Sequence, residues 1–177
     1  VDALRQWTGS SSYTTLYDSR VDPFDRDVFF DRVKHQSTVA IIAFTTDGDI
    51  FGFLYYVRVT KQNEMFRDRD MFAFSFESHG RCETPKRFNV KQAKKESVGV
   101  RFNKDTGYLG FVHFEMEMYD GWVMNHNQMM SFGNEQSSPQ CYSFVTYCFE
   151  DIQPTTLVGD KHRWGRYTCA RLMALQF

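Results

Sequence analysis

The chain has 177 residues, which suits one domain, and carries 21 basic against 22 acidic residues. This balance gives no overall electrostatic argument for binding nucleic acid or a membrane surface, and no apolar run is long enough for a transmembrane helix. Aromatic residues make up 17% of the chain, which favours a β-rich core because aromatic side chains pack well on strands. We expect residues 1–177 to be a single domain taken from a longer protein.

The first part of the chain predicts a helical turn, a strand and a capped helix. Residues 2–7 are expected to form the turn and residues 14–18 the strand. We predict that Asp22 caps a helix beginning at Pro23, because Asp accepts bonds from the first backbone N–H groups and Pro has a preset φ. Phe24 and the apolar residues spaced three and four positions after it give this helix one apolar face.

A β-hairpin is predicted next. Residues 39–44 form a continuous β-branched and apolar run, which is typical of a buried strand. Asp47-Gly48 predicts a type I′ turn with Gly48 at positive φ, and residues 50–57 are the expected return strand.

The rest of the chain predicts further strands and no second helix of clear amphipathic period. Strands are expected at residues 71–77, 97–102, 108–118, 141–149 and 166–177, and a hairpin turn at residues 103–107 is expected to join the second and third. In the first of these, the three Phe residues alternate with Ala and Ser, so we expect one buried and one open face.

Strands that do not alternate with helices argue against a parallel sheet. The sequence therefore predicts a mainly β, α+β fold in which two antiparallel sheets pack as a β-sandwich flanked by short helices. One buried core is expected to hold five aromatic residues, namely Trp7, Phe29, Phe44, Phe51 and Phe74.

No motif in the sequence carries catalytic chemistry. The chain lacks a Gly-x-Ser-x-Gly elbow, a phosphate-binding loop and a dinucleotide-binding glycine turn. Its cysteines, Cys82, Cys141, Cys148 and Cys169, show no C-x-x-C spacing, so we expect reduced thiols in an intracellular protein. We therefore predict a protein that is not an enzyme and has no cofactor.

Three groups of residues invite a metal interpretation. Asp18, Asp22, Asp25 and Asp27 do not follow the calcium-loop pattern, and helix capping accounts for two of them. His113, Glu115 and Glu117 share one strand face and are interpreted as its solvated side. His79 and Cys82 have no second ligand pair at zinc-site spacing. No metal site is predicted.

A local excess of positive charge lies in residues 86–104, where seven basic residues face one acid, Glu96. The simplest interpretation is a solvated loop and edge strand, whose lysines also prevent edge pairing. Two binding interpretations remain open, a protein partner and, alternatively, DNA. The candidate contact residues are Lys86, Arg87, Phe88, Lys91, Lys94 and Lys95.

A pattern of core and turn residues extends over nearly the whole chain and resembles the TLDc domain family. The matching positions are Trp7, Gly9, Leu16, Tyr17, Ser19, Asp22, Phe29, Asp47-Gly48, Phe51-Gly52, residues 72–76, Thr84-Pro85 and residues 167–177. The resemblance implies a β-sandwich with short flanking helices and a non-catalytic role in oxidative-stress resistance. It also implies binding to vacuolar proton-pump subunits. We expect a cytoplasmic or nuclear location. Under the alternative interpretation, the chain is the DNA-binding domain of a stress-response regulator.

Overall fold

A computed structural model describes residues 1–102, 112–113, 121–124, 141–144, 148–153, 155–159 and 166–177. The protein is mainly β, with antiparallel sheets and few short helices, as the sequence predicts. Among the described residues, no helix is long and apolar enough to cross a membrane.

The largest sheet has six strands in the order β1-β12-β2-β3-β5-β6, each antiparallel to its neighbours. The strands are β1 (Thr14–Asp18), β2 (Val39–Thr45), β3 (Ile50–Tyr55), β5 (Phe72–Glu77), β6 (Lys86–Asn89) and β12 (Cys169–Gln176). Strand β12, late in the sequence, therefore lies between two early strands, while β6 lies at an edge of the sheet.

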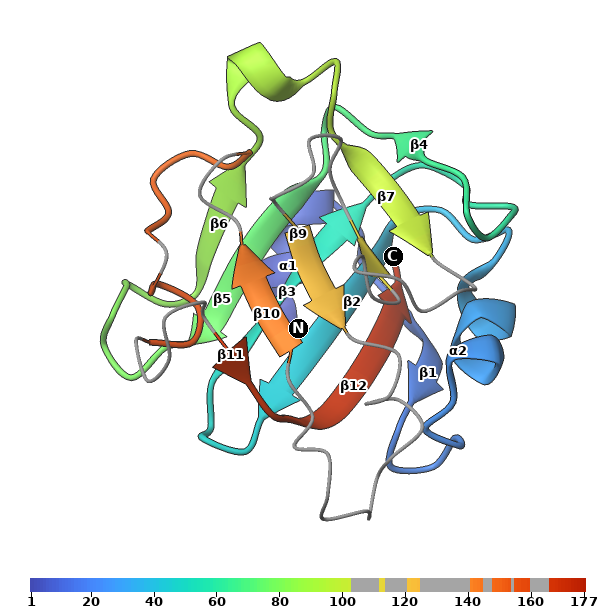
Figure 1. The fold of residues 1–177 in the computed structure, drawn as a ribbon, viewed down its shortest axis with the longest axis horizontal. Coiled ribbons are helices and arrows are strands. Elements are labelled where there is room, and N and C mark those ends of the chain that lie inside the picture. The colour runs from blue at the N-terminus through green and yellow to red at the C-terminus, as the bar shows by residue number, and fades with distance from the viewer. Residues whose placement is uncertain (103–111, 114–120, 125–140, 145–147, 154, 160–165) are drawn as a thin grey trace.

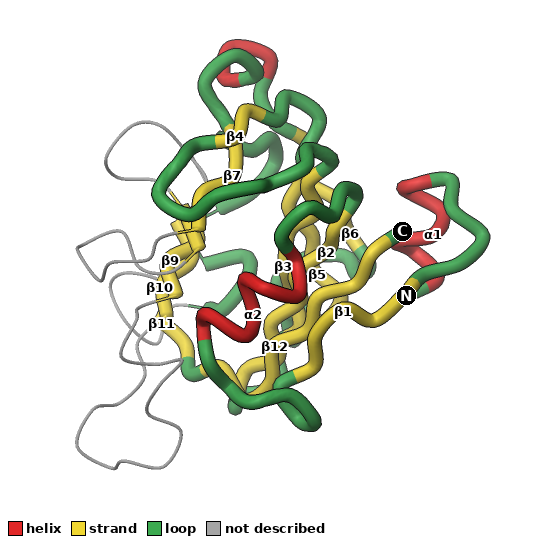
Figure 2. The backbone as a smooth tube through the Cα atoms, turned by 90° about the vertical axis from the view of Figure 1, so that its right-hand side faces the viewer, coloured by secondary structure: helices red, strands yellow, loops and turns green. Residues whose placement is uncertain are grey.

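Two three-stranded sheets complete the β structure, in the orders β4-β7-β8 and β11-β10-β9. Their strands are β4 (Phe66–Arg67), β7 (Gly99–Phe102), β8 (Val112–His113), β9 (Gly121–Met124), β10 (Cys141–Phe144) and β11 (Arg166–Tyr167). The strands β9, β10 and β11 lie in front of the large sheet in Figure 1, and in Figure 2 they lie on the side of it opposite helix α1.

The helices are α1 (Asp2–Thr8), α2 (Arg26–Val33) and the 3₁₀ turn η1 (Gln92–Lys94). The prediction that Asp22 caps α2 is wrong, because the cap is Asp25, whose carboxylate accepts from the backbone N–H groups of Asp27 and Val28. The side chain of Asp22 bonds instead to the backbone N–H of Asp18 and to Arg32. The helix begins three residues later than predicted because the stretch at Pro23 folds as a turn.

The predicted hairpin between β2 and β3 is confirmed, and Gly48 has a φ of 91°. The type I′ assignment is wrong, because that turn needs positive φ at both central residues and Asp47 has none. Instead the N–H of Gly48 bonds to the carbonyl of Thr45, and Thr45 N–H bonds to the carbonyl of Asp49. This is a three-residue loop that ends with glycine in the left-handed region.

The prediction of one core is also wrong, because side chains alternate across the strands and both faces of the large sheet are buried. Phe29 and Phe51 belong to the core between the large sheet, the shorter strands and α2. Phe74 belongs to a second core on the α1 side, where Trp7 and Phe44 pack against it. In β5, Phe72 and Phe74 lie in the second core and Ala73 in the first, so this strand has no open face.

Two of the later strands differ from the prediction. The last strand is two strands, β11 and β12, which belong to different sheets and are separated at Thr168. The strand predicted at 141–149 is β10 at its start, whereas Phe149 forms an isolated bridge to Val90 beyond the end of β6. Of the strand predicted at 108–118, the structure describes β8, and the predicted turn at 103–107 lies outside the described residues.

Candidate functional site

Three chain segments lie side by side at the end of β6. On one side, Asn89 pairs with Phe72 of β5. On the other, Val90 forms a bridge to Phe149, and the N–H of Glu150 donates to the carbonyl of Asn89 at 2.8 Å. Because cross-strand partners share a face, Asn89, Phe72 and Glu150 all lie on the face of the sheet that carries α1.

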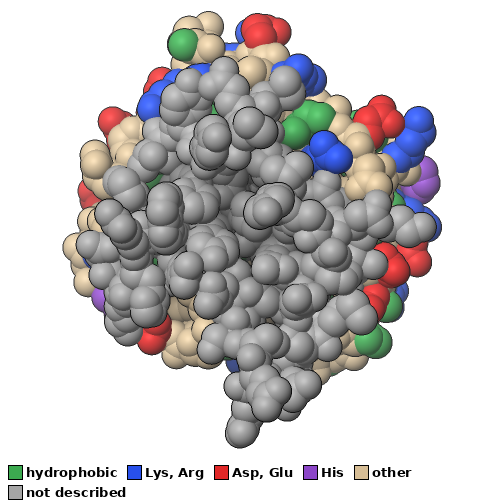
Figure 3. Space-filling model, viewed as in Figure 1, with side chains coloured by type: hydrophobic (Ala, Val, Ile, Leu, Met, Phe, Trp, Pro, Cys, Tyr) green, Lys and Arg blue, Asp and Glu red, His purple; other side chains and the backbone are tan. Residues whose placement is uncertain are grey.

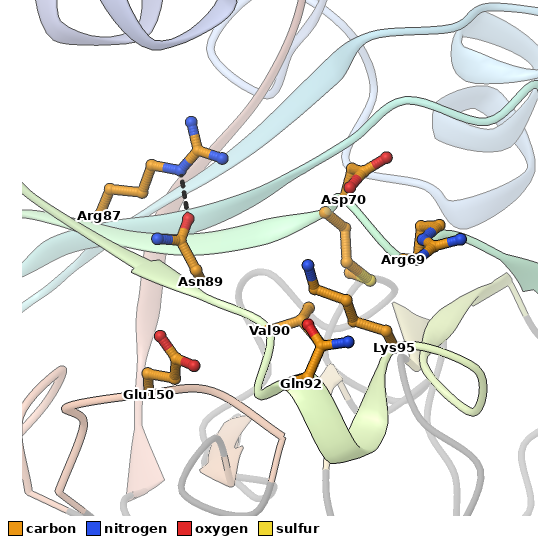
Figure 4. Close-up of a pocket in the computed structure, with 9 residues that line it drawn as sticks. Arg69, Asp70, Arg87, Asn89, Val90, Gln92, Lys95 and Glu150 are labelled. Carbon is orange, nitrogen blue, oxygen red and sulfur yellow. Dashed lines mark hydrogen bonds between the residues drawn. The ribbon is translucent and has the colours of Figure 1, made fainter.

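A charged groove of about 220 Å³ is formed here. It is lined by residues of the loop before β5, of β6, of η1 and of the 148–150 segment, namely Arg69, Asp70, Met71, Arg87, Asn89, Val90, Gln92, Lys95 and Glu150 (Figure 4). We call this surface the charged groove.

Arg87 is the most firmly held cation of the charged groove. Its guanidinium lies 3.9 Å from the centre of the Phe72 ring, a cation–π contact. Its Nε donates to Asn89 Oδ1 at 2.7 Å, and its Nη1 donates to the carbonyl of Trp7 at 3.4 Å. Arg87 therefore links β6 to the end of α1.

Three other charges of the groove have a different environment. Lys95 is half-buried, whereas Asp70 and Glu150 are exposed. Within the part of the chain that the structure describes, none of the three takes part in an ion pair, although cation and carboxylates share one groove. The remaining cation, Arg69, lies 3.8 Å from Glu96. The groove thus combines both signs of charge without neutralising them internally.

The structure brings together only part of the basic segment predicted as a contact surface. Arg87 and Lys95 both line the groove, while Lys91 and Lys94 lie between them in sequence but outside its lining. Lys86 lies over the ring of Phe88 on the opposite face of β6, with its Nζ 5.3 Å from the ring centre.

Phe88 differs from the other predicted contact residues. Its side chain is 1% exposed and belongs to the core on the face away from α1. Its ring is therefore not a surface feature in this fold, because successive side chains of β6 point to opposite faces and the neighbouring Arg87 takes the groove side.

Sequence reasoning missed Arg69, Asp70 and Glu150. The first two belong to a loop that is polar throughout, and Glu150 lies about 60 positions beyond β6 in the sequence. Arg69 and Asp70 could have been connected to the basic segment by one signal, the pairing of β5 with β6 as a hairpin. In such a hairpin the residues just before β5 lie beside those just after β6.

His79, one of the residues considered for metal binding, belongs to a hydrogen-bonded cluster around Asp49. Asp49, 2% exposed, accepts from Arg81 Nη2 at 2.6 Å, and His79 Nε2 lies 3.5 Å from the same carboxylate. His79 Nε2 also donates to the carbonyl of Asp47 at 2.8 Å. Arg81 donates in addition to the carbonyl of Leu157 at 2.9 Å, so this cluster ties the hairpin to the 155–159 segment.

The remaining metal candidates are placed as follows. Cys82 Sγ contacts Ser78 Oγ at 3.3 Å. His113 is in β8, and Glu115 and Glu117 lie outside the described residues. Among the residues that are described, no three His, Cys, Asp or Glu side chains come together as metal ligands would.

Charge on the face shown in Figure 3 is mixed. Around the rim of this face, both basic (Lys, Arg) and acidic (Asp, Glu) side chains of the described residues are visible. No protein-family model matches the chain, and no curated protein is detectably similar to it.

Proposed function

We propose that this chain is a non-catalytic protein-interaction domain with a TLDc-like β-sandwich fold, and that the charged groove is its contact with a protein partner. The observation that carries the proposal is the combination of unpaired Lys95, Asp70 and Glu150 in one groove. Complementary charges on a partner would steer the encounter and fix its orientation.

The size and lining of the groove favour side chains of a partner over a small-molecule substrate. Small-molecule sites typically enclose about 300–1,000 Å³ and are mostly apolar. The charged groove has about 220 Å³ and is lined mainly by charged and amide side chains.

The same lining disfavours the DNA alternative. Nucleic acid presents a continuous row of phosphates, which proteins bind by neutralising them with Lys and Arg. Asp70 and Glu150 would repel such a backbone, and Arg87 is already engaged by Phe72 and Trp7.

The TLDc resemblance extends the proposal to a biological setting. It supports an intracellular role in oxidative-stress resistance, with vacuolar proton-pump subunits as the first partners to test. In that setting the groove would recognise a charged segment of a subunit, and the domain would need no cofactor.

A comparison of three immobilised proteins tests the proposal. The wild-type domain, Lys95→Glu and the control Lys61→Glu are exposed to native extract and to purified pump subunits. Lys61 is an exposed lysine outside the groove, so the control introduces the same change of charge. We expect a partner that is retained by the wild type and the control and lost with Lys95→Glu.

Two outcomes would contradict the proposal. Identical capture by all three proteins would remove the groove from the contact surface. Peroxide consumption by the purified domain that disappears in Cys82→Ser would contradict its non-catalytic character. DNA binding would show itself as an affinity that falls with salt at a log–log slope of roughly −0.9 per neutralised phosphate.

A further inference from the structure

We propose that the charged groove recognises an extended peptide segment in which one acidic residue lies between two basic residues, in the order basic–x–acidic–x–basic. This inference rests on the proposed function and specifies the ligand of the same site. It follows from where the unpaired charges lie relative to the strands.

The two carboxylates lie on opposite sides of β6. Asp70 comes two residues before Phe72, the partner of Asn89, and Glu150 lies beside Asn89 on the other side. In the view of Figure 4, Glu150 is at one end and Asp70 at the other. Adjacent strands are about 4.7–4.9 Å apart and each residue advances about 3.3 Å, so two strand spacings across and two residues along separate the backbones of Asp70 and Glu150 by roughly 12 Å.

Lys95 supplies the cation between them. Figure 4 shows its side chain extending from the η1 segment into the space between Asn89 and Asp70. Arg87 is held by Phe72 and Asn89, which makes Lys95 the cation best suited to accept a carboxylate from outside. Apart from Arg87 and Arg69, which have partners of their own, the charges across the groove are therefore negative, positive and negative.

The neighbouring amides support a carboxylate at the centre. Asn89 Oδ1 accepts from Arg87 Nε at 2.7 Å, which directs the NH₂ of the same amide away from that bond. Asn89 and Gln92 are both exposed and line the groove. Their NH₂ groups are donors that a ligand carboxylate next to Lys95 would use.

An extended peptide matches this arrangement. Alternate residues of an extended chain point to the same side about 7 Å apart, so residues i and i+4 are about 13 Å apart. The flexible stems of Lys and Arg cover the difference between this spacing and that of the two carboxylates. A peptide with acidic residues in all three positions would place like charges against Asp70 and Glu150.

The test uses blocked synthetic peptides and the whole 177-residue chain, with binding followed by amide NMR titration at low salt. The main peptide has the core Lys-Ser-Glu-Ser-Lys. Comparison peptides replace the two Lys by Gln, replace the two Lys by Glu so that all three charged positions are acidic, or replace the central Glu by Lys. The protein variants are Lys95→Glu, the double change Asp70→Asn with Glu150→Gln, and the control Lys61→Glu.

We expect the main peptide to shift the amides around residues 69–71, 89–95 and 150. Its affinity should fall about fivefold in Lys95→Glu and about threefold in the double variant, the range for partly exposed ion pairs, and stay unchanged in the control. The peptide with Lys at its centre should bind Lys95→Glu more tightly than it binds the wild type.

Two results separate a failure of this inference from a failure of the proposed function. The inference that the ligand carries flanking basic residues fails if the all-acidic peptide binds best through Lys95, or if the double variant binds the main peptide as tightly as the wild type does. In either case the groove remains a contact surface. If no peptide shifts the groove amides and Lys95→Glu retains every captured partner, the proposed function fails as well.

Discussion

Arg171 binds Asp18 through two parallel hydrogen bonds, from Nε to Oδ1 at 2.9 Å and from Nη2 to Oδ2 at 2.5 Å. The pair joins β1 to β12, and Ser19 reinforces it, because its N–H donates to the carbonyl of Leu172 and its hydroxyl accepts from the N–H of Leu172. The hydrogen bond from Arg171 is the main reason that the pKa of Asp18 lies below its usual value.

This pair should make stability depend on pH. Because the pKa of Asp18 is lower in the folded state than in the unfolded state, its contribution is present above about pH 4 and is lost as the pH falls through the folded pKa. Arg171→Met should reduce the free energy of unfolding by about 1 kcal/mol at pH 7 and by much less at a pH below the folded pKa of Asp18, as measured in urea melts. Equal losses at both pH values would contradict the assignment, and Lys34→Met is the control from the exposed pair with Asp31.

Gly52 allows β2, β3 and β5 to approach closely at the centre of the large sheet. An added Cβ would overlap the carbonyl oxygen of Ile41 and lie 2.8 Å from the Phe74 ring. Gly52→Ala should therefore lower the free energy of unfolding by about 3 kcal/mol, the upper part of the range for overpacking. Thermal melts of Gly52→Ala and of the exposed hairpin control Thr46→Ala check this. If the two variants lose the same stability within error, the sheet adapts to the added methyl group.

Asp68 organises the loop between β3 and β5. Its carboxylate, in a residue 5% exposed, accepts from the backbone N–H groups of Tyr56, Val57, Asp70 and Met71. Asp68→Ala leaves these donors without their acceptor and should cost about 3 kcal/mol in denaturant melts.

The conservative variant Asp68→Asn provides the comparison. It keeps one acceptor oxygen and should be less harmful than Asp68→Ala. The amide signals of Asp70 and Met71, which line the charged groove, should move more in the Ala variant. Equal stability of both variants would show that the loop is held by other contacts.

The three cysteines whose side chains the structure describes should differ in reactivity. Burial raises the pKa of Cys169 to about 12, and Cys148 is 1% exposed, whereas Cys82 is only partly buried. Since the thiolate is the reactive form, a disulfide reagent at pH 8 should label Cys82 first and reach the other two only on unfolding. The measurement is made in a Cys141→Ser background, and rapid labelling of Cys169 in the folded chain would contradict this assignment.

The sequence predicted strands well where the residues of the strand themselves determine its conformation. The predicted strand at 14–18 has the bounds of β1, and the run at 39–44 is β2 less its last residue. The residue pattern at 166–177 gave no sign that the chain changes sheet at Thr168. Residues on both sides of Thr168 favour strands, and only their tertiary partners place β11 and β12 in different sheets. The division into two cores could not be predicted for the same reason. Alternation of side chains assigns residues to the two faces of a strand but does not show what covers each face.

The candidate site was predictable only in part. Lys95 and Arg87 stood out as members of a basic segment, because charge excess is a local property of the sequence. Glu150 could not be connected to them, since its position depends on the bridge between Val90 and Phe149. The two carboxylates change the character of the surface, from a basic patch to a groove of mixed charge.

The position of β12 sets a constraint on how the protein acquires its fold during synthesis. Residues Thr14–Asp18 pair only with Cys169–Gln176 in the large sheet, and the second neighbour of those late residues is Val39–Thr45. A ribosome must therefore add more than 120 residues after β2 before the gap in the sheet is filled. Until then the early strands expose unpaired backbone edges and apolar side chains, so this part of the nascent chain depends on protection from aggregation until β12 has been synthesised.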